Sequence, residues 1–177
     1  VSCTDLKEAV KEADLVIEAI PELMDLKKET FKIMDEAAPA HTIFASNTST
    51  MKITEIASAT NRPQKVLGLH YFNPAVLMKL VEVIRGEKTS DETMQIGYDF
   101  VVKNNKVPVR VHKDVPGFIV NRVQAPSGVL LGCVLDKKIA EPEEVDAIFK
   151  KMGSPMGPYE TMDYTGLDIG YHGSAYF

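Results

Sequence analysis

The sequence predicts an α/β fold in its first part and an all-helical fold after about residue 113. Short apolar runs bounded by turn residues alternate with segments of helical period, which is typical of a parallel sheet with helices on its faces. A boundary is expected at residues 114–117, Asp-Val-Pro-Gly, because only helical patterns follow it. We therefore expect two domains, residues 1–113 and residues 114–177.

The first 65 residues alternate between helix and strand patterns. Amphipathic spacing predicts helices over residues 4–13, 22–38 and 51–59, and apolar runs predict buried strands over residues 15–20 and 42–45. Thr4 or Asp5 is expected to cap the first helix and Ser49 or Thr50 the third, because such side chains accept hydrogen bonds from free N–H groups.

The rest of the chain changes from mixed to purely helical patterns. Two apolar runs surround the loop at Asn73 and Pro74, and a helix over residues 89–103 and a strand over 107–111 follow. Pro108 places that strand at a sheet edge because proline cannot donate a hydrogen bond to a neighbouring strand. Helices are then predicted over residues 118–135, 141–152 and 159–167, with Pro142 in a tolerated first-turn position.

Composition excludes several classes of function. The 177 residues are 45% hydrophobic and 25% charged, as in ordinary globular domains, and the net charge of -5 argues against nucleic acid as a main partner. No basic stripe for a membrane surface and no apolar run of about 18–20 residues is present. Cys3 and Cys133 are far apart and fit no metal-ligand spacing, which favours a reducing, cytoplasmic compartment and no metal site.

The stretch Val66–Arg85 carries the strongest chemical signal. His70 is its single histidine, Glu82 is its single carboxylate, and each lies in an apolar run. A buried charge costs several kcal/mol or more unless it is paired, so we expect two neighbouring strands on which His70 and Glu82 pair. Such a pair is either a histidine general base held by a carboxylate or a purely structural contact, and the two residues alone leave both open.

The ends of the sequence look cut. A sheet that binds a dinucleotide usually begins with a strand, a glycine-rich turn and a helix, and no G-x-G-x-x-G occurs here. The sequence has no initial methionine and ends where a helical domain is developing. We therefore expect a fragment of a longer chain.

Several segments, in order, resemble the L-3-hydroxyacyl-CoA dehydrogenases of fatty-acid β-oxidation. The resemblance covers about residues 4–168, and the residues after Asp168 match no motif of the family. It implies a Rossmann-type NAD-binding domain, with its N-terminal part missing, followed by an incomplete helical domain that also forms a homodimer. The segments that carry it are Ala13–Glu22, Ile43–Ser49, Gly68–Pro74, Met78–Ile84, Lys113–Arg122, Pro155–Glu160 and Asp163–Asp168.

The resemblance also implies a role for each matching polar residue. His70 matches the catalytic base and Glu82 the residue that orients it. Ser49 and Asn121 match residues that contact the substrate near the reacting oxygen, and Ser49 also lies beside the cofactor. Asn73 matches the residue that helps to place the nicotinamide.

Two more positions match contacts to NAD, namely Glu22 and Lys27. Without the family, Glu22 would be a first-turn acid favoured by the helix dipole, and Lys27 a solvated lysine. Ser49 would be a helix cap and Asn73 a loop-forming residue. Asn121, at an apolar helix start, needs a polar partner in either case.

The implied function is NAD-dependent oxidation of the 3-hydroxyl of an L-3-hydroxyacyl-CoA to the ketone, with no nucleic acid or membrane partner. NAD rather than NADP rests wholly on the resemblance. Two alternatives are a non-catalytic relative of the lens-crystallin kind and a dehydrogenase of a free hydroxy acid. Relatives can carry an enoyl-CoA hydratase domain on the same chain, and the sequence leaves such a fused domain open.

Overall fold

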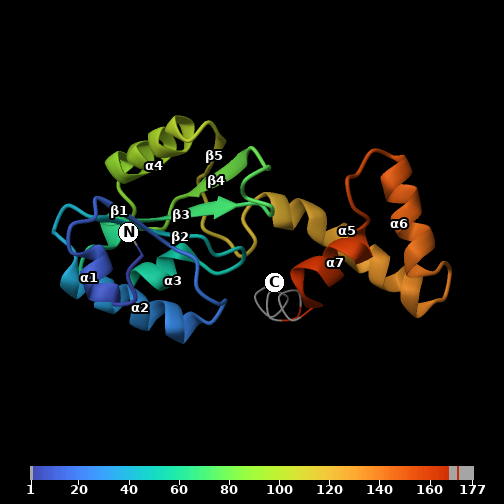
Figure 1. The fold of residues 1–177 in the computed structure, drawn as a ribbon, viewed down its shortest axis with the longest axis horizontal. Helices are drawn as coiled ribbons and strands as arrows, with labels where there is room; N and C mark the ends of the chain where they lie inside the picture. The colour runs from blue at the N-terminus through green and yellow to red at the C-terminus, as the bar shows by residue number, and fades with distance from the viewer. Residues whose placement is uncertain (1, 168–170, 172–177) are drawn as a thin grey trace. The chain divides into compact units, whose positions relative to one another are not determined.

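The computed structural model describes residues 2–167 and residue 171, so Asp168 and His172 lie outside the described residues. The chain divides into two compact units, Val1–Phe118 and Ile119–Phe177. The first unit contains a sheet with helices and the second contains helices (Figure 1).

A five-stranded sheet forms the centre of the first unit, with its strands in chain order across the sheet. The first three strands are parallel, the fourth runs antiparallel to the third, and the fifth is parallel to the fourth. The predicted parallel sheet is therefore mixed, because the short loop at Asn73 cannot make the long crossover that a parallel pair needs. The strands are β1 (Leu15–Glu18), β2 (Ile43–Ser46), β3 (Val66–Tyr71), β4 (Leu80–Ile84) and β5 (Val107–Val111).

Helices cover both faces of the sheet, as the alternating pattern predicts. Figure 1 shows α4 on one side of the strands and α1, α2 and α3 on the other. Asp5 caps α1 and Ser90 caps α4, each accepting a hydrogen bond from a backbone N–H three residues on, as expected for these residue types. The helices are α1 (Leu6–Val10), α2 (Met24–Ala37), α3 (Ile53–Ala57) and α4 (Asp91–Lys103), with a 3₁₀ turn at Pro63–Lys65.

The expected cap of α3 is wrong. This helix begins at Ile53, beyond Ser49 and Thr50, and has no side-chain cap from its own N-cap residue. Asp114 caps the helix instead. Its Oδ1 accepts a hydrogen bond from the N–H of Ile53 at 3.0 Å, and its Oδ2 accepts one from the N–H of Thr54 at 2.6 Å. A residue 61 positions away in the chain thus satisfies the helix start.

The core of the first unit lies between the sheet and its helices. Fully buried residues from β3 and β4, including Leu67, Leu69 and Val83, pack against Met94 of α4. Gly97 permits the close approach of α4, because a Cβ at that position would lie 2.3 Å from Cδ1 of Leu67. Pro108 lies in β5, the edge strand, as predicted.

The second unit consists of α5 (Val120–Asp136), α6 (Pro142–Lys151) and α7 (Pro158–Thr165) in the part of it that the structure describes. Asp146 of α6 accepts hydrogen bonds from the N–H groups of Tyr159 and Glu160, at 2.9 and 3.0 Å, and so caps α7. Lys150 and Glu160 pair across the same two helices at 2.6 Å.

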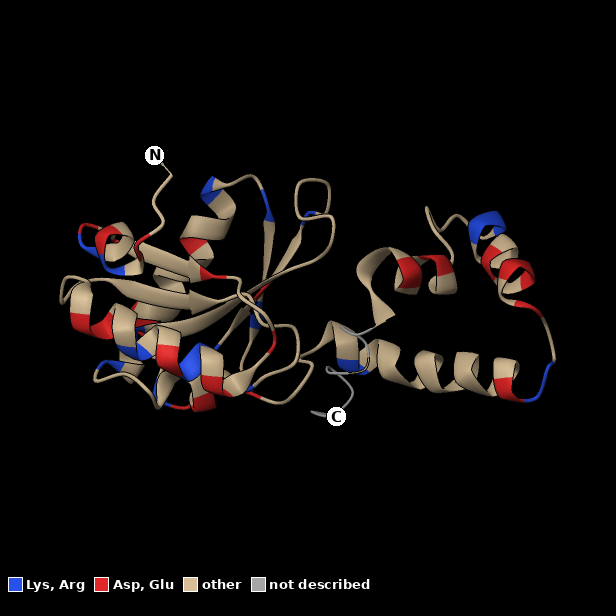
Figure 2. Cartoon of the chain, turned by 60° about the horizontal axis from the view of Figure 1, so that its bottom comes forward, with Lys and Arg blue, Asp and Glu red and all other residues tan. Residues whose placement is uncertain are grey.

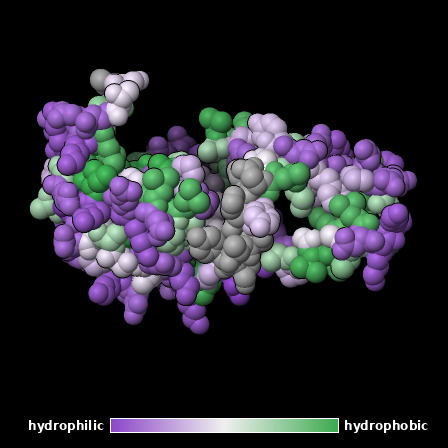
Figure 3. Space-filling view, turned by 90° about the horizontal axis from the view of Figure 1, so that it is seen from below, coloured by the Kyte–Doolittle hydropathy of each residue, from purple (hydrophilic) through white to green (hydrophobic). Residues whose placement is uncertain are grey.

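Helix α5 differs from α6 in its surface. Figure 2 shows charged residues along α6, whereas the middle of α5 carries none. Several large apolar side chains of α5 are exposed, and apolar residues are visible on the surface of this unit in Figure 3. Those of α5 are Val123, Val129, Leu130 and Leu135. No helix in the described part of the chain has the length and hydropathy needed to cross a lipid bilayer.

Candidate active site

His70 and Glu82 form the centre of the candidate site. They stand opposite one another in the antiparallel β3–β4 pair, and Nδ1 of His70 lies 2.7 Å from Oε2 of Glu82. Both side chains are buried. An ionised carboxylate only accepts hydrogen bonds, so Nδ1 carries the proton of the neutral ring and donates it. Nε2 is then the ring nitrogen that can take up a proton.

Aromatic rings surround the imidazole. The rings of Phe72 and Phe118 lie with their centroids 4.5 and 5.7 Å from that of His70, and Phe118 is buried. An apolar wall of this kind lowers the local dielectric and strengthens the interaction between an imidazolium and a carboxylate. The pairing predicted from the sequence is confirmed, and its surroundings suit proton transfer.

The segment Ser46–Ser49, which starts at the last residue of β2 and continues into the loop beyond it, is called the serine loop. The N–H of Ser49 donates to Oε1 of Glu22 at 2.7 Å, and the hydroxyl of Thr48 donates to the same oxygen at 2.8 Å. The N–H of Met51 donates in turn to the Thr48 hydroxyl at 3.0 Å. Glu22 therefore fixes the backbone that presents Ser49.

Asn47 ties the serine loop to β3, the strand that carries His70. Its Oδ1 accepts from the N–H of Tyr71 at 2.9 Å, and its own N–H donates to the carbonyl of Glu18 at 2.8 Å. The carboxyl-terminal ends of β1, β2 and β3 are thereby joined. Open α/β sheets bind their ligands at the carboxyl-terminal ends of their strands. Asn47 is not among the residues predicted from the sequence, because its only signal there is its place between a buried strand and Ser49.

Glu22 and Lys27 differ from what their positions in the sequence predict without the family. Glu22 precedes α2, which begins at Met24, so it is not a first-turn acid of that helix. Lys27 is not solvated: its side chain is 1% exposed, and its Nζ lies 2.7 Å from Oε1 of Glu18 and 3.2 Å from Oε2 of Glu22. The helical period placed Lys27 on the outer face, but Glu18 draws it inward.

Asn73 and Asn121 lie in different units. Asn73 is exposed, in the loop that follows β3. Lys106 supports that loop, since its Nζ donates to the carbonyls of Ala75 and Met78 at 2.5 and 2.7 Å. Asn121 lies in the first turn of α5, in the second unit. Its contact with substrate stays a prediction.

The edge formed by Glu22, Ser49 and His70 fits NAD in its chemistry. The ribose hydroxyls of a dinucleotide need acceptors, and Glu22 supplies a carboxylate there. Its Oε2 is buried and has no hydrogen-bond partner of suitable geometry among the described protein groups, despite the ion contact with Lys27. A hydroxyl donor would satisfy that oxygen.

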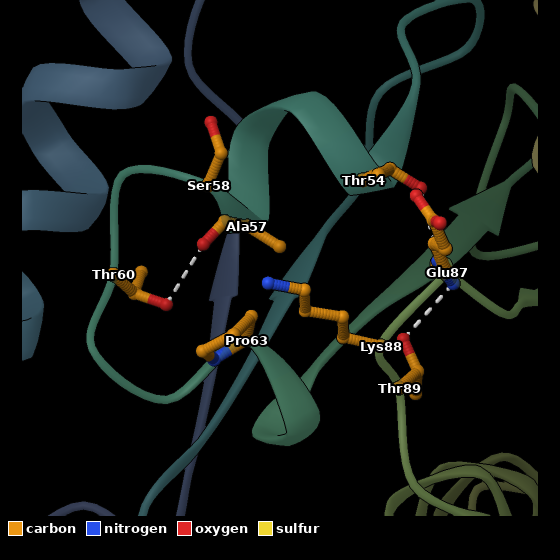
Figure 4. Close-up of a pocket in the computed structure, with 9 residues that line it drawn as sticks. Thr54, Ala57, Ser58, Thr60, Pro63, Glu87, Lys88 and Thr89 are labelled. Carbon is orange, nitrogen blue, oxygen red and sulfur yellow. Dashed lines mark hydrogen bonds between the residues drawn. The ribbon is translucent and has the colours of Figure 1, made fainter.

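A separate pocket lies at the opposite end of β3. It has a volume of about 300 Å³ and lies beside Pro63, which precedes β3, and Gly86, which follows β4. The side chain of Lys88 extends into it, while the hydroxyls of Thr60 and Thr89 are engaged in local hydrogen bonds (Figure 4). None of the predicted site residues lines this pocket, so it is not the candidate active site.

Comparison with protein families gives two adjoining matches. The NAD binding domain of 3-hydroxyacyl-CoA dehydrogenase matches residues 1–115, and the C-terminal domain of 3-hydroxyacyl-CoA dehydrogenase matches residues 117–177. Together they span nearly the whole chain. The predicted fold class, an α/β Rossmann-type part followed by a helical domain, is confirmed.

Similar proteins agree with the family match. A probable 3-hydroxybutyryl-CoA dehydrogenase of Bacillus subtilis is 48% identical over 95% of this chain and 58% of its own length. The mitochondrial hydroxyacyl-coenzyme A dehydrogenase of Sus scrofa is 46% identical over 93% of this chain and 52% of its own length. The chain thus spans somewhat more than half the length of these relatives.

The fold also matches solved structures. The crystal structure of FadB2 from M. tuberculosis superposes with a TM-score of 0.89 at 34% identity, covering 98% of this chain and 61% of that chain. The similarity to this crystal structure covers residues of both units.

Proposed function

The chain belongs to the 3-hydroxyacyl-CoA dehydrogenase family, and from this premise we propose that the protein oxidises the 3-hydroxyl of an L-3-hydroxyacyl-CoA to a ketone with NAD, acting in the cytoplasm. The single observation that carries the proposal is the buried His70–Glu82 pair, with Nδ1 and Oε2 2.7 Å apart. The charge of Glu82 stabilises the imidazolium that forms when His70 accepts a proton.

Oxidation of a secondary alcohol removes a proton from oxygen and a hydride from carbon. NAD, when bound, supplies the acceptor of the hydride. In our proposal Nε2 of His70 takes the proton from the substrate hydroxyl, while Nδ1–H continues to donate to Glu82. In the reverse direction the same nitrogen returns the proton to the ketone oxygen as the hydride is delivered.

The remaining polar residues bind and orient in this proposal. The hydroxyl of Ser49 and the amide of Asn121 bind the oxygen of the substrate. Asn73 helps to place the nicotinamide beside His70. Glu22 and Lys27 belong to the cofactor side of the site, where the carboxylate of Glu22 accepts from a ribose hydroxyl.

The replacement His70→Ala in the complete protein tests this function. NADH formation at 340 nm, with 3-hydroxybutyryl-CoA and NAD, is expected to fall by about 10²–10⁴-fold, the usual share of general acid–base catalysis. His41→Ala is the matched control, because His41 is an exposed histidine paired with Asp14 on the surface. Undiminished activity of His70→Ala would overturn the proposal.

The wild-type protein also decides between the proposal and its alternatives. Turnover of a free hydroxy acid, without turnover of the acyl-CoA, would change the proposed substrate class from acyl-CoA thioesters to free hydroxy acids. No absorbance change with either, from a folded complete chain, would favour a non-catalytic relative.

A homodimer is part of the proposal. It is supported by the exposed apolar side chains of α5, since a solvated helix seldom presents several large apolar residues. Sedimentation of the complete protein checks it: Leu130→Glu on α5 is expected to give monomers, and Glu143→Lys on α6 is not. A wild-type monomer at micromolar concentration would contradict this part.

A further inference from the structure

We propose that Glu18 is a positioning residue, which holds the serine loop through a closed ring of buried hydrogen bonds and ion pairs. This inference rests on the proposed function, because the shape of the loop matters to the reaction only if Ser49 and Glu22 contact the ligands. The ring itself is a property of the first unit and can be tested without turnover.

One branch of the ring runs directly from β1 to the loop. Oε2 of Glu18 accepts a hydrogen bond from the hydroxyl of Ser46 at 2.7 Å. The oxygen of that hydroxyl accepts in turn from the N–H of Thr48 at 3.2 Å. All three residues are buried, so water does not compete for these bonds.

The other branch passes through α2. Nζ of Lys27 donates to Oε1 of Glu18 at 2.7 Å and lies 3.2 Å from Oε2 of Glu22. Oε1 of Glu22 accepts from the Thr48 hydroxyl and from the N–H of Ser49. Both branches therefore end at Thr48, and the loop cannot move there without breaking one of them.

The charges explain why the ring is stiff. Lys27 and Glu18 are each 1% exposed at the side chain, and a buried charge needs a partner at every polar atom. Nζ of Lys27 also donates to the carbonyl of Ile20 at 3.1 Å, and Oε1 of Glu18 also accepts from the N–H of Ile20 at 2.7 Å. The ammonium is thus engaged inside the protein, where it holds Glu18 and Glu22 together.

Ser46→Ala is the mildest cut in the ring, because it leaves every charge paired. In the complete protein we expect faster amide hydrogen exchange over residues 46–51, measured by mass spectrometry. We also expect kcat/KM to fall by about 10-fold, since small displacements of positioning groups cost this much or more. The acidic limb of the pH–rate profile should stay in place, because His70 and Glu82 lie outside the ring. Ser58→Ala, which removes an exposed hydroxyl that donates to the carbonyl of Glu55, is the matched control.

Glu18→Gln keeps a single acceptor oxygen and no charge, so it can hold at most one of the two branches, and it leaves Lys27 with one carboxylate. We expect a larger loss of kcat/KM and a Kd for NADH, from fluorescence titration, raised by about 10-fold, together with a lower Tm. The double variant Glu18→Gln/Lys27→Met also removes the cation that pairs with Glu22, which leaves that carboxylate without its ion pair, so its Tm should fall further. If the ring positions the loop, NADH affinity falls already in Glu18→Gln and is not restored in the double variant.

The outcomes separate this inference from the proposed function. Exchange rates, kcat/KM and NADH affinity of Ser46→Ala equal to those of Ser58→Ala would overturn the ring. Wild-type NADH affinity in Glu18→Gln would reduce the ring to a structural role and overturn it too. An inactive wild-type protein would instead refute the proposed function, and the exchange rates of Ser46→Ala would still decide whether Glu18 holds the loop.

Discussion

His70 and Glu82 face one another across the antiparallel β3–β4 pair, so that one hydrogen bond joins two neighbouring strands at the candidate site. The imidazole of His70 is therefore oriented by the sheet itself rather than by a flexible loop.

Glu82→Gln should lower activity less than His70→Ala does. A glutamine oxygen can still accept from Nδ1, but it does not carry the charge that stabilises the imidazolium. We expect kcat to fall by about 10–10²-fold, below or at the lower end of the range for loss of the base itself. Steady-state rates of NADH formation check this, with the exposed Glu87→Gln as control. A loss greater than that of His70→Ala would contradict the assigned roles.

Asp114→Ala should destabilise the protein, because the N–H groups of Ile53 and Thr54 lose their acceptor. The expected cost is about 1–3 kcal/mol in the free energy of unfolding, as for the loss of a helix cap with a charged acceptor. Asp114→Asn keeps one oxygen and should lose about half as much. Urea unfolding of the complete protein measures both. Asp99→Ala, an exposed aspartate of α4, should change little, and equal losses at the two positions would argue against the cap.

Gly97→Ala should lower stability although alanine favours helices. Its Cβ would lie 2.3 Å from Cδ1 of the buried Leu67, and overpacking of a core costs about 1–3 kcal/mol against a helix-propensity gain of about 1 kcal/mol. Leu67→Ala opens the space that the new methyl group needs. The double variant should therefore be more stable than the sum of the two single changes predicts. Additive effects in urea unfolding would show that α4 shifts away instead.

Tyr71 should titrate above the usual range. Burial raises the pKa of its hydroxyl above 10.0 because the phenolate is poorly solvated there. The raised folded pKa stabilises the fold fully below pH 10, and that stabilisation disappears as the pH rises through the folded pKa. Absorbance at 295 nm should lose its latest-titrating component in Tyr71→Phe. The prediction would be contradicted if the tyrosine that disappears from the titration curve in Tyr71→Phe had an ordinary pKa.

Local patterns predicted the positions of most elements. Ser90 caps the amphipathic segment that follows it, and this local contact places α4. Pro108 lacks an N–H group, and this local property places its strand at the edge of the sheet. Both effects depend only on neighbouring backbone, so one sequence is enough to predict them. The pairing of His70 with Glu82 was also predictable, because a lone titratable group in each of two buried runs needs the other.

Long-range contacts account for the features that the sequence did not predict. The start of α3 depends on Asp114, and no periodicity links that residue to Ile53. Lys27 was assigned to solvent because its helix face is otherwise charged, whereas its partner lies in β1. Glu18 resembles Glu82 in being a lone carboxylate in a buried run, and that pattern is enough to mark it as a residue that needs a buried partner.

The register of β3 and β4 also restricts which insertions and deletions the gene can accept. Residues added within the loop around Asn73 leave Glu82 opposite His70, because the ladder on either side keeps its alignment. A single-residue deletion between Leu80 and Glu82 turns the carboxylate to the other face of the sheet, since side chains alternate along a strand. The His70–Glu82 pairing should therefore survive length variation in the loop beyond Asn73, whereas a deletion only a few codons later should be eliminated by selection.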